Sequence, residues 1–301
     1  IVVPGFQLGD RVDVEDDARL YQAASGDDSD NLNDDDGVPS FQFLVAGRVD
    51  TLPITASAPG RLDAWIDFNG DGDWDDRGEQ VAANVAWGQG TFPLTIPTPG
   101  DATPGWMVGR FRFSSTGGLA PTGPAFDGEV EDTDLFIINP QAAGNLTVRQ
   151  KGSTVNIVGD NSQSVLVMSA GRQLGVAGFF GGYGTTVNGQ GGDSAGVAFA
   201  KVRNLNIRLN GGADLLIVDN TLITGGFGVL ALRGQFLLDL GAGEDLAFLS
   251  KIAVNRTAII NGGADSDVVF VEDSLFNNNT QVTTDTGDDL VVFEDTTFAR
   301  S

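Results

Sequence analysis

Residues 261–271, Asn-Gly-Gly-Ala-Asp-Ser-Asp-Val-Val-Phe-Val, place a turn rich in Gly, Asn and Asp directly before an apolar run. These turn residues followed by Val and Phe are typical of a tight turn that leads into a strand. The same pattern recurs at 209–218, 240–249 and 285–293. The aspartates before the apolar runs are Asp214, Asp245, Asp267 and Asp289, at spacings of 31, 22 and 22. A period of about 22 residues predicts a right-handed parallel β-helix (β-solenoid), because each coil buries its apolar face only by stacking on the next.

The repeat has a weaker copy and one irregular interval. The weaker copy, Gly191-Gly192-Asp193, precedes Asp214 at a spacing of 21. The longest interval, from Asp214 to Asp245, is expected to hold an insertion at Gly225–Gly228. A β-sandwich remains the alternative fold for this part of the chain. The turns look similar to the Gly-Gly-x-Gly-x-Asp repeats of repeats-in-toxin proteins, but the nine-residue period of those repeats is missing. Solvated turn aspartates are therefore favoured over calcium ligands here.

Strand signals extend through the whole chain, and no sustained helical pattern of apolar residues is present. The composition changes near residue 139, because all four tryptophans (Trp65, Trp74, Trp87 and Trp106) and ten of the 11 prolines precede it. We therefore expect an all-β protein with two domains. Residues 1–139 form an N-terminal β-sandwich of jelly-roll or immunoglobulin-like type, and residues 140–301 form the β-helix.

Charge and missing residue types limit the partners. With 41 acidic and 17 basic residues the net charge is −24, which disfavours nucleic acid and anionic membranes. No apolar run approaches the length of a membrane span. The sequence has no Cys and no His, so any metal must be a hard cation bound by oxygen, for which Ca²⁺ is the natural candidate. Because the sequence begins at Ile1, we expect a mature chain or a fragment of a longer one.

One acidic segment has the spacing of a metal-binding loop. Asp67, Asn69, Asp71, Asp73 and Asp75 carry a side-chain oxygen at every second position, with Gly70 and Gly72 between them. Alternate oxygens in a tight loop can turn onto one ion, as in the first seven positions of an EF-hand loop. The closing acid, Glu79, comes one residue late, and no helices flank the loop. An acidic hairpin turn without metal remains the alternative.

Two further acidic clusters are candidates for a second ion site. The first lies within residues 27–36 and supplies Asp28, Asp30, Asp34 and Asp36; the second supplies Glu129, Glu131 and Asp132. Clustered acids repel one another unless solvent or a cation neutralises them. If the fold brings the two clusters together, they form a second calcium site; solvated surface loops are the alternative.

The first part of the chain resembles the GEVED domain, a bacterial module named after its signature. That signature is present as Gly128-Glu129-Val130-Glu131-Asp132, and similar stretches occur at 26–38, 62–74 and 110–114. The resemblance covers about residues 7 to 138, with Thr133 where the family usually has Tyr. It implies a β-sandwich module of large secreted and surface-anchored bacterial proteins, with no enzymatic activity attached.

These features favour a non-catalytic, secreted bacterial protein with a structural or adhesive role at the cell surface, stabilised by calcium. The alternative is a β-helix that degrades polysaccharide, or one that binds it through tryptophan rings. The repeat is still running at residues 289–293, so the last coil is expected to recruit further repeats of a larger surface protein or a second copy. The apolar segment Ile1–Phe6 is a candidate strand for such head-to-tail assembly into a fibre.

Overall fold

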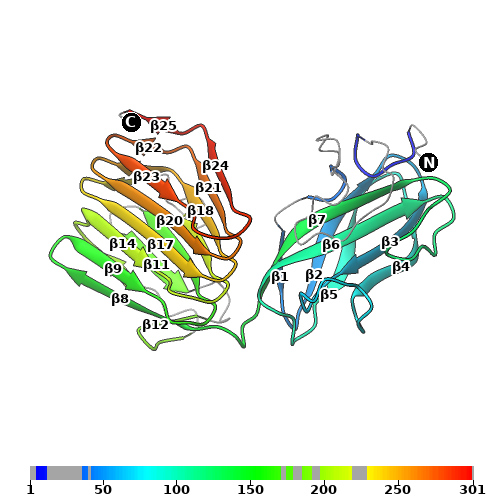
Figure 1. Ribbon diagram of the computed structural model, residues 1–301, viewed down its shortest axis with the longest axis horizontal. Helices are drawn as coiled ribbons and strands as arrows, with labels where there is room; N and C mark the ends of the chain where they lie inside the picture. The colour runs from blue at the N-terminus through cyan, green and yellow to red at the C-terminus, as the bar shows by residue number, and fades with distance from the viewer. Residues whose placement is uncertain are drawn as a thin grey trace. The chain divides into compact units, whose positions relative to one another are not determined.

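The computed structural model describes residues 5–11, 36–39, 42–170, 174–178, 185–191, 197–218 and 229–299. Every regular element in these ranges is a β-strand, which confirms the predicted all-β class. The same ranges contain no helix long and apolar enough to cross a membrane. The chain divides into two compact units, Ile1–Asn139 and Pro140–Ser301 (Figure 1).

The first unit contains two sheets in its described residues. Its strands are β1 (Gln42–Val45), β2 (Val49–Ala56), β3 (Gly60–Ile66), β4 (Gln80–Trp87), β5 (Gly90–Pro97), β6 (Gly105–Ser114) and β7 (Glu129–Ile138). One sheet has the order β1-β7-β6-β3-β4, and the other pairs β2 with β5. Strand β1 runs parallel to β7, whereas the remaining pairs are antiparallel.

The two sheets of this unit share one apolar core. Leu52 and Ile54 alternate with more exposed neighbours along β2, as a half-buried strand requires. They pack in one cluster with side chains from the larger sheet, including Phe111 and Leu135. Leu8 of the N-terminal segment is also fully buried in this cluster. Apolar burial therefore ties the segment before β1 to both sheets.

The second unit contains eighteen strands in its described residues. They are β8 (Asn145–Lys151), β9 (Thr154–Val158), β10 (Val165–Ala170), β11 (Leu174–Gly178), β12 (Thr186–Val187), β13 (Val197–Phe199), β14 (Asn204–Arg208), β15 (Leu215–Val218), β16 (Leu230–Leu232), β17 (Phe236–Ala242), β18 (Leu246–Ser250), β19 (Ile252–Val254), β20 (Ala258–Ala264), β21 (Val268–Glu272), β22 (Leu275–Phe276), β23 (Thr280–Thr283), β24 (Leu290–Glu294) and β25 (Thr297–Phe298). They form three sheets: β13-β11-β10-β15-β18-β21-β24, β12-β8-β9-β14-β17-β20-β23 and β16-β19-β22-β25.

Strands of successive repeats pair in parallel, and the pairing follows the period of the sequence. Leu246 pairs with Val268, which pairs with Leu290, so neighbours along this ladder are one repeat apart. The longer interval is accommodated between Leu215 and Leu246, which also pair in parallel. Alternate side chains from the sheets, such as Ile207 and Leu249, meet in one core cluster. The predicted insertion at Gly225–Gly228 and the weaker copy at Gly192 and Asp193 lie outside the described residues.

The repeats approach each other so closely that a glycine is needed in the turn. Gly263 has φ +120°, and a Cβ there would lie 1.9 Å from the carbonyl oxygen of Gly241 in the preceding repeat. A side chain at this position would therefore collide with backbone as well as strain its own. The turn glycines of the sequence pattern thus serve the stacking of repeats.

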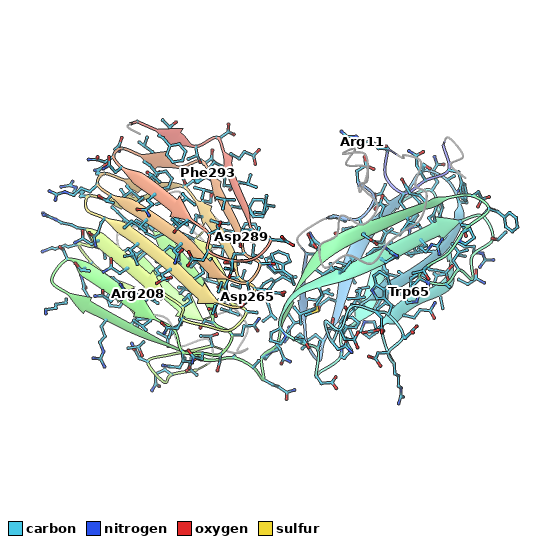
Figure 2. All side chains as sticks on the ribbon, in the orientation of Figure 1. Arg11, Trp65, Arg208, Asp265, Asp289 and Phe293 are labelled. Carbon is cyan, nitrogen blue, oxygen red and sulfur yellow. The ribbon has the colours of Figure 1, made fainter. Side chains whose placement is uncertain are left out.

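The expectation that the turn aspartates are solvated is wrong for three of them. Asp214 and Asp245 are fully buried, and Asp267 is 1% exposed. Each lies immediately before a strand, where the next repeat stacks on its turn and covers the carboxylate. Asp289, in the last of these turns, is partly exposed; it and Asp265 are labelled in Figure 2.

Candidate metal centre

The loop between β3 and β4, residues 67–79, is shaped from within by Asp67. One carboxylate oxygen of Asp67 accepts the N–H of Gly70 at 2.7 Å, and the other accepts that of Gly72 at 2.9 Å. Gly70 and Gly72 have φ values of +73° and +88°, a region that favours glycine. The buried Asp67 therefore fixes the loop backbone that carries the acids after it.

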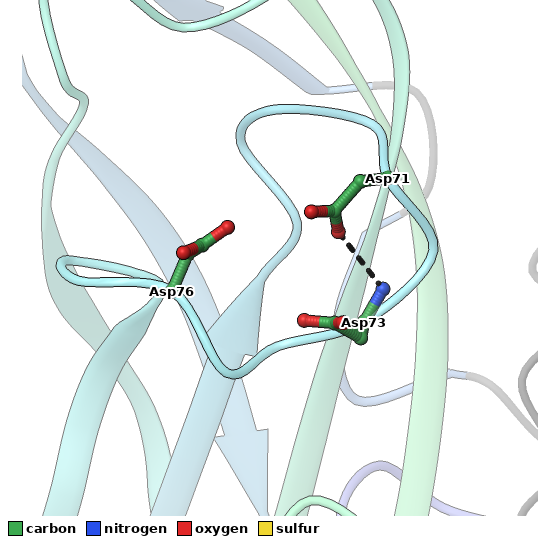
Figure 3. A group of neighbouring side chains, drawn as sticks. All are labelled: Asp71, Asp73 and Asp76. Carbon is green, nitrogen blue, oxygen red and sulfur yellow. Dashed lines mark hydrogen bonds between the residues drawn. The ribbon is translucent and has the colours of Figure 1, made fainter.

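Three exposed carboxylates converge inside this loop. Asp71, Asp73 and Asp76 each place a carboxylate oxygen within 4.8 Å of the other two. Figure 3 shows the three side chains directed into the space that the loop encloses, with the backbone N–H of Asp73 donating to Asp71 at 3.2 Å. Two oxygens on opposite sides of a calcium ion are roughly 4.6–5.2 Å apart. The group therefore has the dimensions of a calcium site, and it is the one such cluster within the described residues.

Asn69 bridges two of these carboxylates through its amide nitrogen. Its Nδ2 donates to Asp71 Oδ2 at 3.0 Å and to Asp76 Oδ2 at 2.6 Å. The two N–H groups present the positive end of the amide dipole to two negative charges. The two N–H groups thus reduce the repulsion between the carboxylates, as a cation at this place would.

Glu79 closes the loop at its far end. Its two oxygens accept the backbone N–H groups of Phe68 at 3.2 Å and Asp76 at 3.1 Å, so one side chain ties both ends of the loop. Glu79 is 2% exposed. Burial raises its pKa to about 7, with the nearby charges of Asp67 and Asp76 acting in the same direction. A cation close to this carboxylate would favour its ionised form.

The structure differs from the alternating ligand pattern predicted from the sequence at one position. Asp71 and Asp73 belong to the group, but their third partner is Asp76 rather than the predicted Asp75. The carboxylate of Asp73 accepts the N–H of Asp75 at 2.9 Å, so this part of the loop is a tight turn. The turn changes the direction of the side chains after Asp73, and counting every second residue therefore misses Asp76. In the sequence, Asp75 and Asp76 are adjacent, so either of them could have been taken as the third member of the group.

Two of the signature acids of β7 accept hydrogen bonds from the backbone of the N-terminal segments. Glu129 Oε2 accepts the N–H of Leu8, and Glu131 Oε1 accepts that of Gly37 at 2.9 Å. Asp36 accepts the N–H of Asp10 at 2.8 Å. The two acidic clusters of the sequence are thus neighbours, since Glu131 contacts the residue next to Asp36. Asp28, Asp30 and Asp34 lie outside the described residues, and a second ion site there stays a prediction.

Asp132 has an arginine partner at the place where the sequence suggested a cation ligand. Arg110 of β6 donates from Nε to Asp132 Oδ1 at 2.7 Å and from Nη2 to Oδ2 at 2.5 Å, and both side chains are buried. The guanidinium also lies over the ring of Trp74, 4.5 Å from its centroid. Because Trp74 belongs to the acidic loop, this contact joins the loop to the signature strand.

The tryptophans of the acidic loop region pack inside the unit. Trp65, Trp74 and Trp87 are 3%, 6% and 8% exposed, and Trp74 Nε1 donates to the carbonyl of Val108 at 3.4 Å. A ring that stacks on a sugar needs an open face. These three rings therefore serve packing in this structure.

We expect Glu131→Ala to loosen the N-terminal segment. The substitution leaves the buried N–H of Gly37 without its carboxylate acceptor, at a cost of about 1–3 kcal/mol. Hydrogen exchange followed by mass spectrometry should show the largest loss of protection at residues 36–39. The exposed Asp101→Ala is the matched control and should leave exchange unchanged. Equal protection of Gly37 in both variants would show that the signature acid does not hold this segment.

The first unit is therefore an all-β module with an acidic loop after β3 and a buried arginine–carboxylate pair on its last two strands. Residues 61–133 match the family model of the GEVED domain, which confirms the predicted resemblance over this segment. The match contains both the loop and the signature. No curated protein and no solved structure matched the chain.

Proposed function

We propose that this chain is a non-catalytic structural or adhesive protein of the bacterial cell surface, and that its acidic loop binds calcium. The observation that carries the calcium site is the convergence of Asp71, Asp73 and Asp76 within 4.8 Å. Carboxylate oxygens are the ligands that calcium prefers, and extracellular calcium is abundant enough for sites of modest affinity. Asp71, Asp73 and Asp76 would hold the ion, which would take the place of the Asn69 amide nitrogen between the carboxylates.

Calcium also explains why so many acids sit in one exposed turn. Asp71, Asp73 and Asp76 repel one another across distances that bulk solvent screens only in part. Asp67 and Glu79 fix the loop backbone, and their oxygens are taken up by N–H groups. The loop thus separates acids that set its shape from acids that face its interior. A divalent ion offsets the repulsion of the second group and makes the loop rigid.

For the architecture we propose a β-sandwich followed by a right-handed parallel β-helix. The shared core of the two sheets in the first unit supports the sandwich. In the second unit, each of the last three repeats gives one strand to each of the three sheets: β17, β18 and β19, then β20, β21 and β22, then β23, β24 and β25. Parallel pairing at a constant offset is what a coiled stack of strands produces.

A structural role fits the placement of the three buried turn acids of the second unit better than hydrolysis does. A glycosidase needs two carboxyl groups about 5–10 Å apart that reach the substrate. Asp214, Asp245 and Asp267 are buried between repeats and face no substrate. For partners we propose further repeats or copies of the same kind, since the edge strands β24 and β25 leave Leu290, Phe293 and Phe298 exposed. Extracellular polysaccharide is the alternative partner.

A polysaccharide panel tests this proposal directly. The full chain, with calcium present, is incubated with acidic and neutral polysaccharides while reducing ends and unsaturated products are measured. We expect no turnover above that of heat-inactivated protein. Turnover that survives purification and disappears on heating would contradict the structural role. Binding without turnover would favour a polysaccharide adhesin.

A further inference from the structure

The buried turn aspartates form a continuous row along the second unit. Ser164 N–H donates to Asp214 Oδ1, Asp214 N–H to Asp245 Oδ1, Asp245 N–H to Asp267 Oδ1 and Asp267 N–H to Asp289 Oδ1, at 2.5 to 3.0 Å. In each turn, the backbone N–H therefore donates to an aspartate side chain of the next repeat instead of to a backbone carbonyl. We call these four residues, Asp214, Asp245, Asp267 and Asp289, the aspartate row. It connects successive repeats once per turn, as the period in the sequence requires.

The second oxygen of each buried member of the row is sealed without a partner. Oδ2 of Asp214, Asp245 and Asp267 is buried and has no hydrogen-bond partner among the described residues. A methyl group placed at Gly262 would lie 2.8 Å from Asp267 Oδ2, so the glycine backbone covers this oxygen. An ionised carboxylate with such an oxygen is unsolvated and uncompensated, which proteins avoid.

Among the described residues, the charged groups that act most strongly on the row are negative. Asp160 acts on Asp214, Glu244 and Asp265 act on Asp245 and Asp267, and Asp289 acts on Asp267. No lysine or arginine in the described part of the chain forms an ion pair with the three buried carboxyls. Burial, followed by these like charges, raises the pKa of Asp214 to about 10, that of Asp245 to about 8 and that of Asp267 to about 7.

We propose that Asp214 and Asp245 are protonated and Asp267 is about half protonated in the folded protein at neutral pH, and that the three residues form a proton-dependent seam that holds the repeats together. A neutral carboxyl keeps the Oδ1 acceptor for the neighbouring N–H and removes the buried charge. A proton also needs no space beside the covered oxygen, whereas a cation needs several ligands around it. At alkaline pH the carboxyl groups of neighbouring turns ionise, and the repulsion between their negative charges separates the repeats.

The sign of the pH dependence follows from the raised pKa values. In the unfolded chain these aspartates lose their protons near pH 4. Their contribution to stability is therefore complete below about pH 4 and is lost as the pH rises toward the folded values of about 7 to 10. Each group that stays protonated only in the folded state raises the unfolding constant about tenfold per pH unit in this window.

Substitution by Asn tests the seam, because Asn keeps the shape and the acceptor of a neutral Asp but cannot ionise. Opening of residues 214–218, 245–250 and 267–272 is measured by hydrogen exchange in the full chain between pH 5 and pH 10. In the wild type the opening constant should rise steeply with pH. In Asp214→Asn/Asp245→Asn/Asp267→Asn the rise of the opening constant should be smaller, by up to about a thousandfold per pH unit below pH 7, where each of the three groups contributes about tenfold, and by less at higher pH. Asp288→Asn, an exposed acid in the last of these turns, should leave the slope unchanged.

Infrared spectroscopy of the wild type provides a second measurement that does not depend on folding of the variants. The carbonyl stretch of protonated carboxyl groups should be present at neutral pH and should disappear on alkaline titration together with protection of the repeats. Equal slopes in the wild type and the Asn variants would overturn the proposal. The proposal would also be overturned if calcium stabilised the wild-type repeats and their stability increased with pH, because the carboxylates of the row would then bind a cation.

Discussion

Arg110→Met is expected to destabilise the first unit by about 3–5 kcal/mol. The arginine is fully buried and makes two hydrogen bonds to Asp132, so its removal leaves a buried carboxylate without its cation. The same change removes the guanidinium from the ring of Trp74. Because Trp74 belongs to the acidic loop, the variant should weaken calcium binding as well as lower the stability of the unit.

Urea unfolding followed by tryptophan fluorescence measures this effect in the first unit, because all four tryptophans lie there. Arg61→Met is the matched control, since Arg61 is an exposed arginine on the neighbouring strand β3. The double variant Arg110→Met/Asp132→Leu replaces the pair by apolar side chains and should recover most of the lost stability. A loss below about 1 kcal/mol for Arg110→Met would show that the pair is not a structural element.

The acids of the GEVED signature make buried contacts that hold other parts of the first unit in place. Glu129 and Glu131 accept backbone N–H groups of Leu8 and Gly37, while Asp132 binds Arg110. Side chains from one strand therefore hold two N-terminal segments and one buried arginine. Substitution of any of the three acids removes a buried partner rather than a surface charge.

The repeat was predictable from the sequence because its causes are local. Glycine and aspartate recur where turns need them, and the parallel pairing of Leu246, Val268 and Leu290 follows the same period. The burial of Asp245 was not predictable in this way. An aspartate in a turn is usually solvated, and only the stacking of the next repeat, with its own carboxyl in register, covers it.

The candidate metal site was predictable as a loop but not as a set of ligands. The alternation of acids with Gly70 and Gly72 indicates a tight turn with converging oxygens. Which oxygens converge depends on the backbone direction after Asp73, and this selects Asp76 over Asp75. The contact of Glu131 with Gly37 joins residues 94 apart, and no local pattern specifies it.

Calcium is expected to stabilise the first unit by about 2.7 kcal/mol at a hundredfold excess over its dissociation constant, because it binds the folded loop alone. This corresponds to a rise of roughly 10 °C in the melting temperature of a unit of this size. Asp71→Asn should remove most of the rise, since Asp71 lies in the converging group and its carboxylate is exposed.

The most direct test of the calcium site compares two adjacent aspartates in the same turn. Melting of the full chain is followed by tryptophan fluorescence, with calcium and with chelator, for the wild type, Asp76→Asn and Asp75→Asn. The structure places Asp76 in the converging group and Asp75 outside it. We therefore predict that calcium raises the melting temperature of the wild type and of Asp75→Asn, and that Asp76→Asn loses most of this rise. Identical melting of the wild type with calcium and with chelator would contradict the calcium site, and loss of the effect in Asp75→Asn alone would contradict the ligand set.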